Sequence, residues 1–306
     1  MQQKQQTVKK EYTFEGKGLH TGNVARVTIK PAPVDFGIKF KRVDLGENAI
    51  VEALAENVSN TARSTTITKN EVSIVTIEHL MSALTGLGVD NALIEIDNIE
   101  VPILDGSAKP YVSAIAPDGL QEQDADRKYI EIDHTIEYRD DEKGVIITIE
   151  PAEVPSYDVT IDFNSQVVGV QTAHWDPSVN YGKSVGRCRT FVFFHEIEFL
   201  YKNNLIKGGD VDNAIVIVEY PVTKEQLEHM CKCFGVPALD VLEDGYLNNV
   251  RLRFSNECAR HKLLDLIGDM RLVGGFLKAK ITTVKSGHRT NTEAAKLIRK
   301  ELKNRQ

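Results

Sequence analysis

Two short segments far apart in the sequence carry side chains that bind metal ions. The first reads Thr-Ile-Glu-His-Leu and holds Glu78 and His79, and the second reads Arg-His-Lys-Leu-Leu-Asp and holds His261 and Asp265. A third segment, Lys-Ser-Gly-His, ends at His288. Two histidines and one carboxylate suit a catalytic zinc site, in which three protein ligands leave one position open for water.

The spacing of the second segment places its polar groups on one side of a helix. His261 and Asp265 are four residues apart, so they share a helical face, and Asp269 follows one turn later. Asp269 could then orient a histidine from behind. Spacing alone favours the simpler interpretation of a solvated polar face, because short patterns of His and Asp recur by accident.

Glu78 and His79 are also ambiguous when they are taken alone. Adjacent residues of a helix point in different directions. They can share a site at the start of a helix, with His79 on the metal and Glu78 reaching the reacting water. The alternative, which the pair alone favours, is that Glu78 serves only the helix dipole. The metal site therefore depends on all the segments occurring together.

Composition narrows the class of protein. The 306 residues suffice for one large or two modest domains, and 42% of them are hydrophobic. The net charge of -7, with both signs spread along the chain, argues against nucleic acid as the main partner. The polar N-terminus has no export signal and no apolar run is long enough to span a bilayer. We therefore expect a cytoplasmic protein without stable membrane insertion, whose four cysteines are reduced thiols.

Both halves of the chain show one pattern, in which a strand is followed later by a helix with a histidine near its start and then by another strand. The ranges are 24–29, 78–84 and 92–96 in the first half and 144–152, 260–266 and 277–282 in the second. Gly86 and Gly88 in one half and Gly268 in the other are helix-ending signals. The pattern is a β…αβ unit used twice, which is a weak internal repeat.

The polar segment 121–127 predicts a linker between the halves, so we divide the chain into domains at residues 1–127 and 128–306. The strands alternate apolar and polar residues, which indicates antiparallel sheets with one buried face. Helices cover that face, so the predicted fold class is α+β, with two similar layered domains. Helical spacing at 292–302 predicts a last helix.

Taken together, the motifs resemble those of the zinc-dependent UDP-3-O-acyl-N-acetylglucosamine deacetylases of bacterial lipid A synthesis, over nearly the whole chain. The matching motifs are GLHTG at 18–22, TIEHL at 76–80, PILDGS at 102–107, RTF at 189–191, DNAIV at 212–216, RHKLLD at 260–265 and SGH at 286–288. The resemblance implies that the helices of the two domains pack face to face, with the active site between the domains.

The resemblance also implies a role for each chemical group. The implied zinc ligands are His79, His261 and Asp265, although two histidines and a carboxylate can hold Fe²⁺ as well. Glu78 is the implied general base for the attacking water, and His288 is the acid that protonates the leaving amine.

Two further residues support this chemistry by resemblance. Asp269 holds His288 and favours its charged form. Thr190 donates a hydrogen bond to the oxyanion.

Substrate contacts follow from the same resemblance. Lys262 at the rim of the site, Lys285 and His20 are expected to meet the diphosphate, and Phe163 to stack on uracil. A solvated surface cation is the alternative for each lysine. Phe191 is also expected to bind substrate, and the acyl passage is implied at Ile197, Leu200, Leu205, Val211 and Ala214, which can equally be core residues.

The implied reaction removes the N-acetyl group of UDP-3-O-(3-hydroxyacyl)-N-acetylglucosamine, the committed step of lipid A biosynthesis. Three rivals stay open, which are a deacetylase of another nucleotide sugar, a non-catalytic binding protein and a purely structural metal site. Some members of the family carry a fused dehydratase domain.

Overall fold

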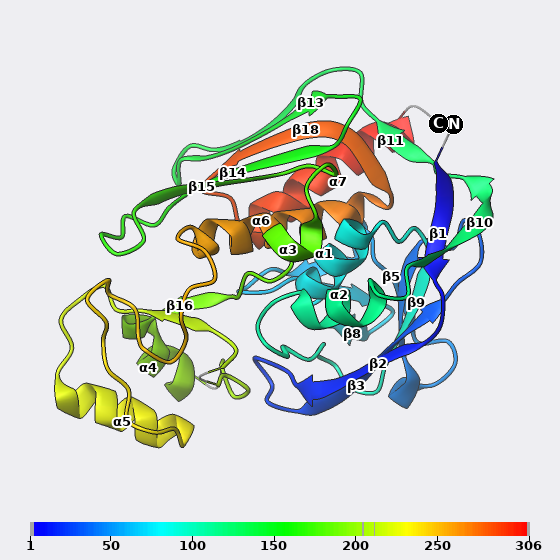
Figure 1. Ribbon diagram of the computed structural model, residues 1–306. Helices are drawn as coiled ribbons and strands as arrows, with labels where there is room; N and C mark the ends of the chain where they lie inside the picture. The colour runs from blue at the N-terminus through cyan, green and yellow to red at the C-terminus, as the bar shows by residue number, and fades with distance from the viewer. Residues whose placement is uncertain (1–2, 204, 211, 305–306) are drawn as a thin grey trace.

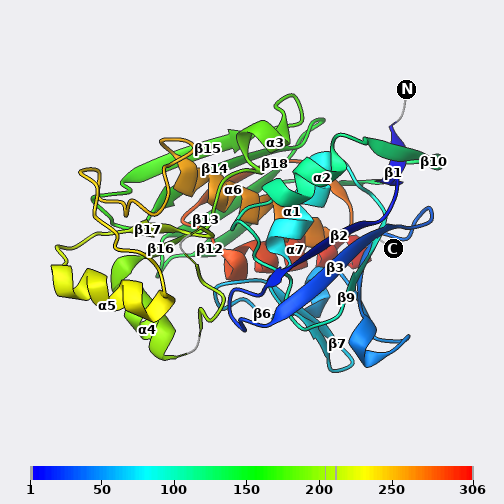
Figure 2. The ribbon, with the colours of Figure 1, turned by 60° about the horizontal axis from the view of Figure 1, so that its bottom comes forward.

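A computed structural model describes residues 3–203, 205–210 and 212–304 of the chain. Two sheets lie on either side of a central pair of helices, α1 (Glu78–Leu87) and α6 (Glu257–Met270) (Figure 1). A smaller lobe that contains α4 (Phe194–Lys202) and α5 (Lys224–Phe234) projects from one side of the molecule (Figures 1 and 2). This arrangement confirms the predicted α+β class.

The sheet of the first half has the strand order β2-β3-β9-β4-β5. Its strands are β2 (Tyr12–Lys17), β3 (Val24–Pro31), β4 (Ile38–Arg42), β5 (Ile50–Glu52) and β9 (Ala92–Ile96). The sheet of the second half has the order β12-β13-β18-β14-β15, with β11 (Tyr129–Glu131) also beside β18. Its strands are β12 (Ile136–Asp140), β13 (Val145–Pro151), β14 (Ser156–Asp162), β15 (Val170–Trp175) and β18 (Phe276–Val284).

The sheets are mixed and not purely antiparallel as expected. The strand after each central helix enters the middle of its sheet, so β9 lies between β3 and β4, and β18 between β13 and β14. The two strands on either side of the inserted strand run in opposite directions, so the inserted strand must be parallel to one of them. The parallel pairs are β4–β9 and β14–β18. The halves thus share one path order, which agrees with the internal repeat, although duplication stays an interpretation.

The remaining elements cover the two sheets or link them. They are β1 (Lys4–Val8), β6 (Val58–Asn60), β7 (Thr66–Lys69), β8 (Val72–Ile74), β10 (Leu120–Asp126), β16 (Phe191–Phe193), β17 (Ile215–Ile217), α2 (Lys109–Ile115), α3 (Tyr181–Ser184), α7 (His288–Asn304) and the 3₁₀ turns η1 (Val43–Leu45), η2 (Ala55–Asn57) and η3 (Arg271–Val273). The predicted last helix is confirmed as α7. Among the described residues, no helix combines the length and the apolar composition that crossing a bilayer requires.

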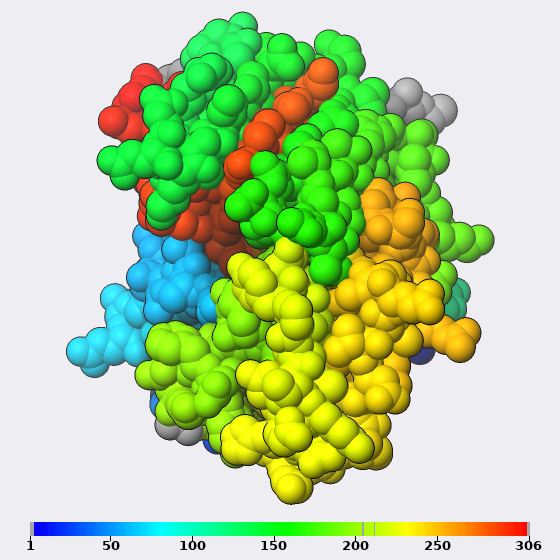
Figure 3. Space-filling view, turned by 90° about the vertical axis from the view of Figure 1, so that its left-hand side faces the viewer, coloured from blue at the N-terminus to red at the C-terminus, as the bar shows by residue number. Residues whose placement is uncertain are grey.

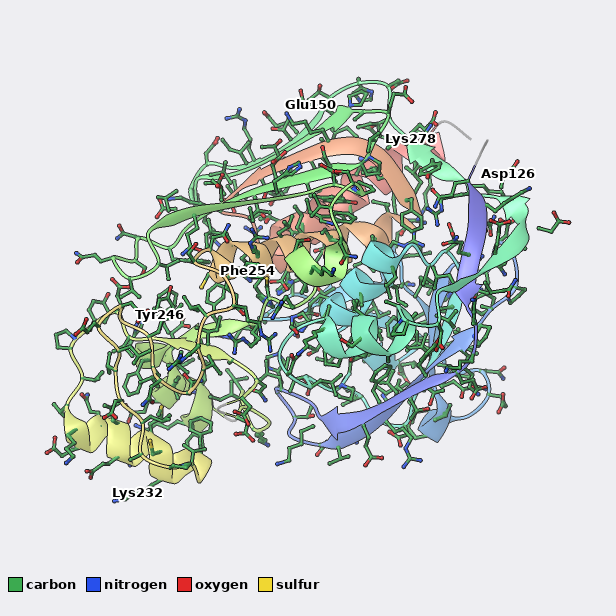
Figure 4. All side chains as sticks on the ribbon, viewed as in Figure 1. Asp126, Glu150, Lys232, Tyr246, Phe254 and Lys278 are labelled. Atoms are coloured by element: carbon green, nitrogen blue, oxygen red, sulfur yellow. The ribbon has the colours of Figure 1, made fainter. Side chains whose placement is uncertain are left out.

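The expected linker at 121–127 forms a strand instead. Most of it belongs to β10, which pairs antiparallel with β1 (Figure 1). Arg127 at its end is buried and donates two hydrogen bonds to Asp90, at 2.9 and 2.8 Å. Asp126, labelled in Figure 4, lies on this edge of the molecule. The polar composition reflects an edge ribbon, and where the domains divide stays a prediction.

Two glycines that we expected to end helices lie inside them. α1 continues through Gly86 and ends at Gly88, whose φ of 91° is left-handed. α6 likewise continues through Gly268. A Cβ added at Gly268 would lie 2.2 Å from the carbonyl oxygen of Glu78, and one at Gly86 would lie 2.2 Å from the ring of Tyr181. Both glycines therefore permit close packing, which outweighs their cost in a helix.

The lobe has its own small hydrophobic core. The buried side chains of this core are Ile197, Val216, Val218, Met230, Cys231 and Leu247. The parallel pair β16–β17 joins the lobe to the rest of the chain. In the space-filling view, the yellow-green to orange residues of the lobe cover the lower part of the face, below the green strands of the second half (Figure 3). Exposed Lys232 lies at its outer edge (Figure 4).

Candidate metal and active site

The two central helices bring the three expected ligands together. The ligand atoms of His79, on α1, and of His261 and Asp265, on α6, all lie within 4.8 Å of one another. Asp265 Oδ1 is 3.6 Å from His79 Nε2 and 3.4 Å from His261 Nε2. All three residues are buried. The solvated-face interpretation of α6 is therefore wrong, because the shared face packs against α1.

The hydrogen bonds around these residues leave the correct atoms available for a metal ion. His261 Nδ1 lies 3.1 Å from the carbonyl oxygen of Cys188, so Nδ1–H donates there and Nε2 keeps its lone pair. Asp265 Oδ2 accepts from Lys262 Nζ at 2.8 Å. Asp265 Oδ1 is buried and has no hydrogen-bond partner among the described residues. A buried carboxylate oxygen without a donor is costly, and a cation between the imidazoles would satisfy it.

Protonation states also suit metal binding. Burial lowers the pKa of His261 to about 3, so its imidazole is neutral at physiological pH. Burial acts to raise the pKa of Asp265, but His261, Lys262 and His288 outweigh burial and lower that pKa well below its ordinary value. Neutral imidazole and ionised carboxylate are the forms that bind metal ions.

Glu78 and His288 lie next to this cluster and face each other. Glu78 begins α1 and His288 begins α7, and Glu78 Oε1 is 3.9 Å from His288 Nε2. His288 Nε2 is also 3.9 Å from Asp265 Oδ2. Burial raises the pKa of Glu78, despite the opposing charge of His288. A carboxylate and an imidazole at this separation can accept and donate protons on one bound molecule.

Asp269 holds His288 from behind, as the resemblance implied. His288 Nδ1 lies 2.9 Å from Asp269 Oδ2, which also accepts from Asn291 Nδ2 at 3.0 Å. Burial acts to lower the pKa of His288, but Asp269, Asp265 and Glu78 outweigh burial and raise it to about 9. His288 of the metal-free chain is therefore an imidazolium at neutral pH.

Thr65 is a site residue that the sequence analysis missed. Its backbone N–H donates to Glu78 Oε2 at 3.0 Å, and its hydroxyl donates to Asp269 Oδ1 at 2.6 Å. It lies just before β7 and is completely buried. A threonine within Ser-Thr-Thr carries no local signal of such a role, because the contacts depend on how the strands are arranged in space.

A cavity of about 120 Å³ lies between the lobe and the first half of the chain. Three of the five residues expected at the acyl passage, Ile197, Leu200 and Ala214, line this cavity, together with His20, Thr190 and Phe191, which were expected in other roles. Val211 lies outside the described residues. Leu205 is exposed and is not among the residues that line this cavity, so its place in the passage stays a prediction; its carbonyl accepts from His20 Nδ1 at 2.8 Å.

Phe191 connects the cavity to the metal cluster. Its ring centroid lies 6.1 Å from that of His261 and 5.5 Å from that of Phe163, which is partly exposed. Lys285 forms an ion pair of 2.9 Å with Asp162, beside Phe163. The ion pair therefore brings Lys285, expected to meet the diphosphate, to the residue next to Phe163, expected to stack on uracil, although the two are far apart in sequence.

Lys262 is partly exposed beside the fully buried metal ligands, which agrees with its expected position at the rim of the site. Its ammonium group is paired with Asp265 and lies 5.6 Å from the centroid of Phe191. Burial acts to lower the pKa of Lys262, but the Asp265 carboxylate outweighs burial and raises it. The cation therefore fixes a metal ligand, and contact with phosphate stays a prediction.

Two buried carboxylates that the sequence analysis missed hold the surrounding segments. Glu100 accepts hydrogen bonds from the backbone N–H groups of His20 and Thr21, at 2.9 and 2.8 Å. Glu257, at the start of α6, accepts from Arg189 Nε at 3.0 Å and thereby ties the Arg-Thr-Phe motif to the metal helix. An acidic residue alone in the sequence gives no sign of such a partner.

Comparison with known proteins agrees with this geometry. The chain matches the sequence model of the LpxC family, described as UDP-3-O-acyl N-acetylglycosamine deacetylase, over residues 5–233 and 236–300. It is 46% identical over 301 residues to the bifunctional enzyme LpxC/FabZ of Porphyromonas gingivalis, covering 98% of this chain and 65% of that protein.

Two further relatives show similar agreement. The chain is 43% identical over 300 residues to the bifunctional enzyme LpxC/FabZ of Bacteroides thetaiotaomicron, again covering 65% of that protein. It is 40% identical over 298 residues to the UDP-3-O-acyl-N-acetylglucosamine deacetylase of Cellvibrio japonicus, covering 96% of this chain and 90% of that protein. The chain thus spans about two thirds of its bifunctional relatives. By its match to the family model and its identity to these relatives, the chain belongs to the UDP-3-O-acyl N-acetylglycosamine deacetylase (LpxC) family.

Proposed function

We propose that this chain is a zinc-dependent deacetylase that hydrolyses the N-acetyl group of UDP-3-O-(3-hydroxyacyl)-N-acetylglucosamine and releases acetate. The observation that carries the proposal is the buried Asp265 Oδ1, which has no hydrogen-bond partner in the described part of the chain and lies between two imidazoles, next to a facing pair of Glu78 and His288. A structural zinc site has four strong protein ligands, whereas three ligands beside a proton acceptor and a proton donor support catalysis.

The chain's own residues supply the proton transfers. When bound, Zn²⁺ supplies Lewis-acid chemistry and makes water more acidic. Glu78 takes the proton of the attacking water through Oε1, since Oε2 already accepts from Thr65. His288, kept protonated by Asp269, gives the proton on Nε2 to the leaving nitrogen of the sugar. The Thr190 hydroxyl donates to the developing oxyanion, a contact worth roughly 3 kcal/mol in other hydrolases.

The two ends of the substrate bind on either side of this centre. The acyl chain enters the cavity lined by Phe191, Ile197 and Ala214, whose walls are mostly apolar. The uracil stacks on exposed Phe163, and Lys285 beside it meets the diphosphate.

The reaction is the committed step of lipid A biosynthesis. The four cysteines are all unpaired, which supports a reducing cytoplasmic location.

The test is deacetylation of the acylated substrate by the chain as purified, after chelation, and after Zn²⁺ or Fe²⁺ is added back separately. Activity that vanishes on chelation and returns with Zn²⁺ supports the proposal. Activity that returns only with Fe²⁺ would mean that iron, and not zinc, is the catalytic metal. Equal turnover of UDP-N-acetylglucosamine would contradict the acylated substrate. A folded, zinc-loaded chain that turns over no acyl length would be a binding protein.

A further inference from the structure

Thr65 contacts both sides of the site with different parts of one residue. Its backbone faces α1, because its N–H donates to Glu78 Oε2 at 3.0 Å and its carbonyl accepts from Ile77 N–H at 3.2 Å. Its side chain faces α6, because Oγ1–H donates to Asp269 Oδ1 at 2.6 Å. These contacts come from a single residue that is completely buried, so they cannot change independently.

The Thr65 hydroxyl fixes the orientation of the Asp269 carboxylate. Oδ2 of this group accepts from His288 Nδ1 and from Asn291 Nδ2, both on α7. Among the described residues, Oδ1 accepts a hydrogen bond only from Thr65. Without the hydroxyl, one oxygen of a completely buried carboxylate has no donor, and rotation toward another donor would relieve the cost. Such a rotation would move the acceptor that holds His288.

We infer that Thr65 is a positioning residue, which fixes the proton acceptor Glu78 and the carboxylate that orients the proton donor His288 in one arrangement. The inference rests on the proposed deacetylase function. Glu78 Oε1 and His288 Nε2 are 3.9 Å apart, and both must reach atoms of one substrate amide and its water. Proton transfer tolerates displacements of only about 0.5 Å, so a shared anchor for both groups raises turnover and leaves substrate binding alone.

The experiment compares Thr65→Val with Thr65→Ser. Valine keeps the shape and the backbone N–H to Glu78 but removes the hydroxyl, whereas serine restores the hydroxyl. For Thr65→Val we expect kcat to fall about tenfold or more, equivalent to about 1.4 kcal/mol in the barrier, with KM and zinc content unchanged. For Thr65→Ser we expect kcat close to that of the parent chain.

Thr85→Val is the matched control. Thr85 is also buried, lies on α1 with Glu78, and donates its hydroxyl to Met81 O at 2.8 Å, at the other end of the helix. Loss of the Thr85 hydroxyl should lower the melting temperature without lowering kcat. If Thr65→Val behaves like Thr85→Val, or if Thr65→Ser fails to recover turnover, Thr65 is only a structural residue and the inference is wrong.

A crystal structure of Thr65→Val separates this inference from the proposed function. A rotated Asp269 carboxylate and a displaced His288 ring support the positioning role, even if the parent chain deacetylates no substrate of any acyl length. If both side chains keep their places at 2.9 Å, the positioning role is overturned whatever the activity. Inactivity of the parent chain alone would overturn only the proposed function.

Discussion

Gly268 of α6 lies against the backbone of Glu78 on α1, so closely that an added Cβ would be 2.2 Å from the carbonyl oxygen. The central helices come from opposite halves of the chain, and their separation sets the distance between His79 and the two ligands on α6. The contact at Gly268 therefore brings the halves close enough for one metal ion to reach all three ligands.

Gly268→Ala should destabilise the chain and weaken metal binding. Alanine is better than glycine in a helix by about 1 kcal/mol, but overpacking a core costs about 1–3 kcal/mol, and here the neighbour is rigid backbone. We expect lower unfolding free energy in denaturant titrations and weaker Zn²⁺ binding by calorimetry. Gly287→Ala, with open space around its Cβ, is the control for unfolding. Equal stability of the two variants would mean that α1 and α6 are free to separate.

The same glycine shows where sequence reasoning succeeds and where it stops. Local motifs indicated helices where α1 and α6 lie, and the family resemblance of those motifs implied the ligands His79, His261 and Asp265, whereas spacing alone favoured a solvated face. Gly268 was misread as a helix end, because its reason is a contact across 190 residues of sequence. Thr65 was missed for the same reason. The motifs, through the resemblance they carry, therefore predicted the groups that carry chemistry, and only the fold showed what holds them.

Strand direction was wrong for a related reason. Alternating residues in β3 and β13 correctly indicated one buried face, but alternation carries no information about the direction of a neighbouring strand. The polar 121–127 segment looked like a linker because an edge strand such as β10 buries little side-chain surface. The two errors left the placement of the site unaffected, since the ligands lie on the helices.

Asp269→Asn should move the alkaline limb of the pH–activity curve to lower pH. Burial opposes the charge on His288, and the Asp269 carboxylate is the largest contribution that outweighs burial and raises the pKa to about 9. A bound Zn²⁺ would lower this pKa in both proteins, so the shift between them is the quantity to measure, from kcat/KM against pH. Asp158→Asn, at the surface pair with His174, should leave the limb in place. An unmoved limb in Asp269→Asn would remove His288 as the acid.

The same pair predicts how stability depends on pH in the metal-free chain. The folded pKa of His288 is raised, so its contribution is fully present below about pH 6.5, its ordinary pKa, and is lost as pH rises toward about 9. We expect Asp269→Asn to flatten this part of the curve of unfolding free energy against pH. A parent chain whose stability is flat over this range would contradict the raised pKa.

His261→Gln should lose zinc while keeping the fold. Glutamine removes one of the three ligands, so the metal ion would be held only by His79 and Asp265. We therefore expect less than stoichiometric zinc after purification. Zn²⁺ at 100 times its dissociation constant stabilises a native protein by about 2.7 kcal/mol, so added zinc should raise the melting temperature of the parent only. His174→Gln on the surface should behave as the parent does. Unchanged zinc content in His261→Gln would remove His261 from the ligands.

Glu78→Gln should separate turnover from stability. The amide cannot take a proton from water, so we expect kcat to fall about 10²–10⁴-fold with zinc retained. Burial raises the pKa of Glu78, so its charged form is unfavourable in the folded chain, and the neutral variant should be at least as stable in urea. Glu131→Gln, which removes only a surface pair with Lys278, is the control. Turnover that survives in Glu78→Gln would rule out Glu78 as the general base.

Ala214→Leu should shift acyl preference toward shorter chains. Ala214 lines the cavity of about 120 Å³, so a larger side chain removes space that methylene groups of the substrate would occupy. Each buried methylene contributes about 0.8 kcal/mol, so each one excluded should lower kcat/KM by roughly fourfold. The measurement is kcat/KM over a series of 3-hydroxyacyl lengths, with exposed Val154→Leu as the control. A uniform loss at every length would mean that the acyl chain does not enter this cavity, because only a chain long enough to reach Ala214 can sense the change.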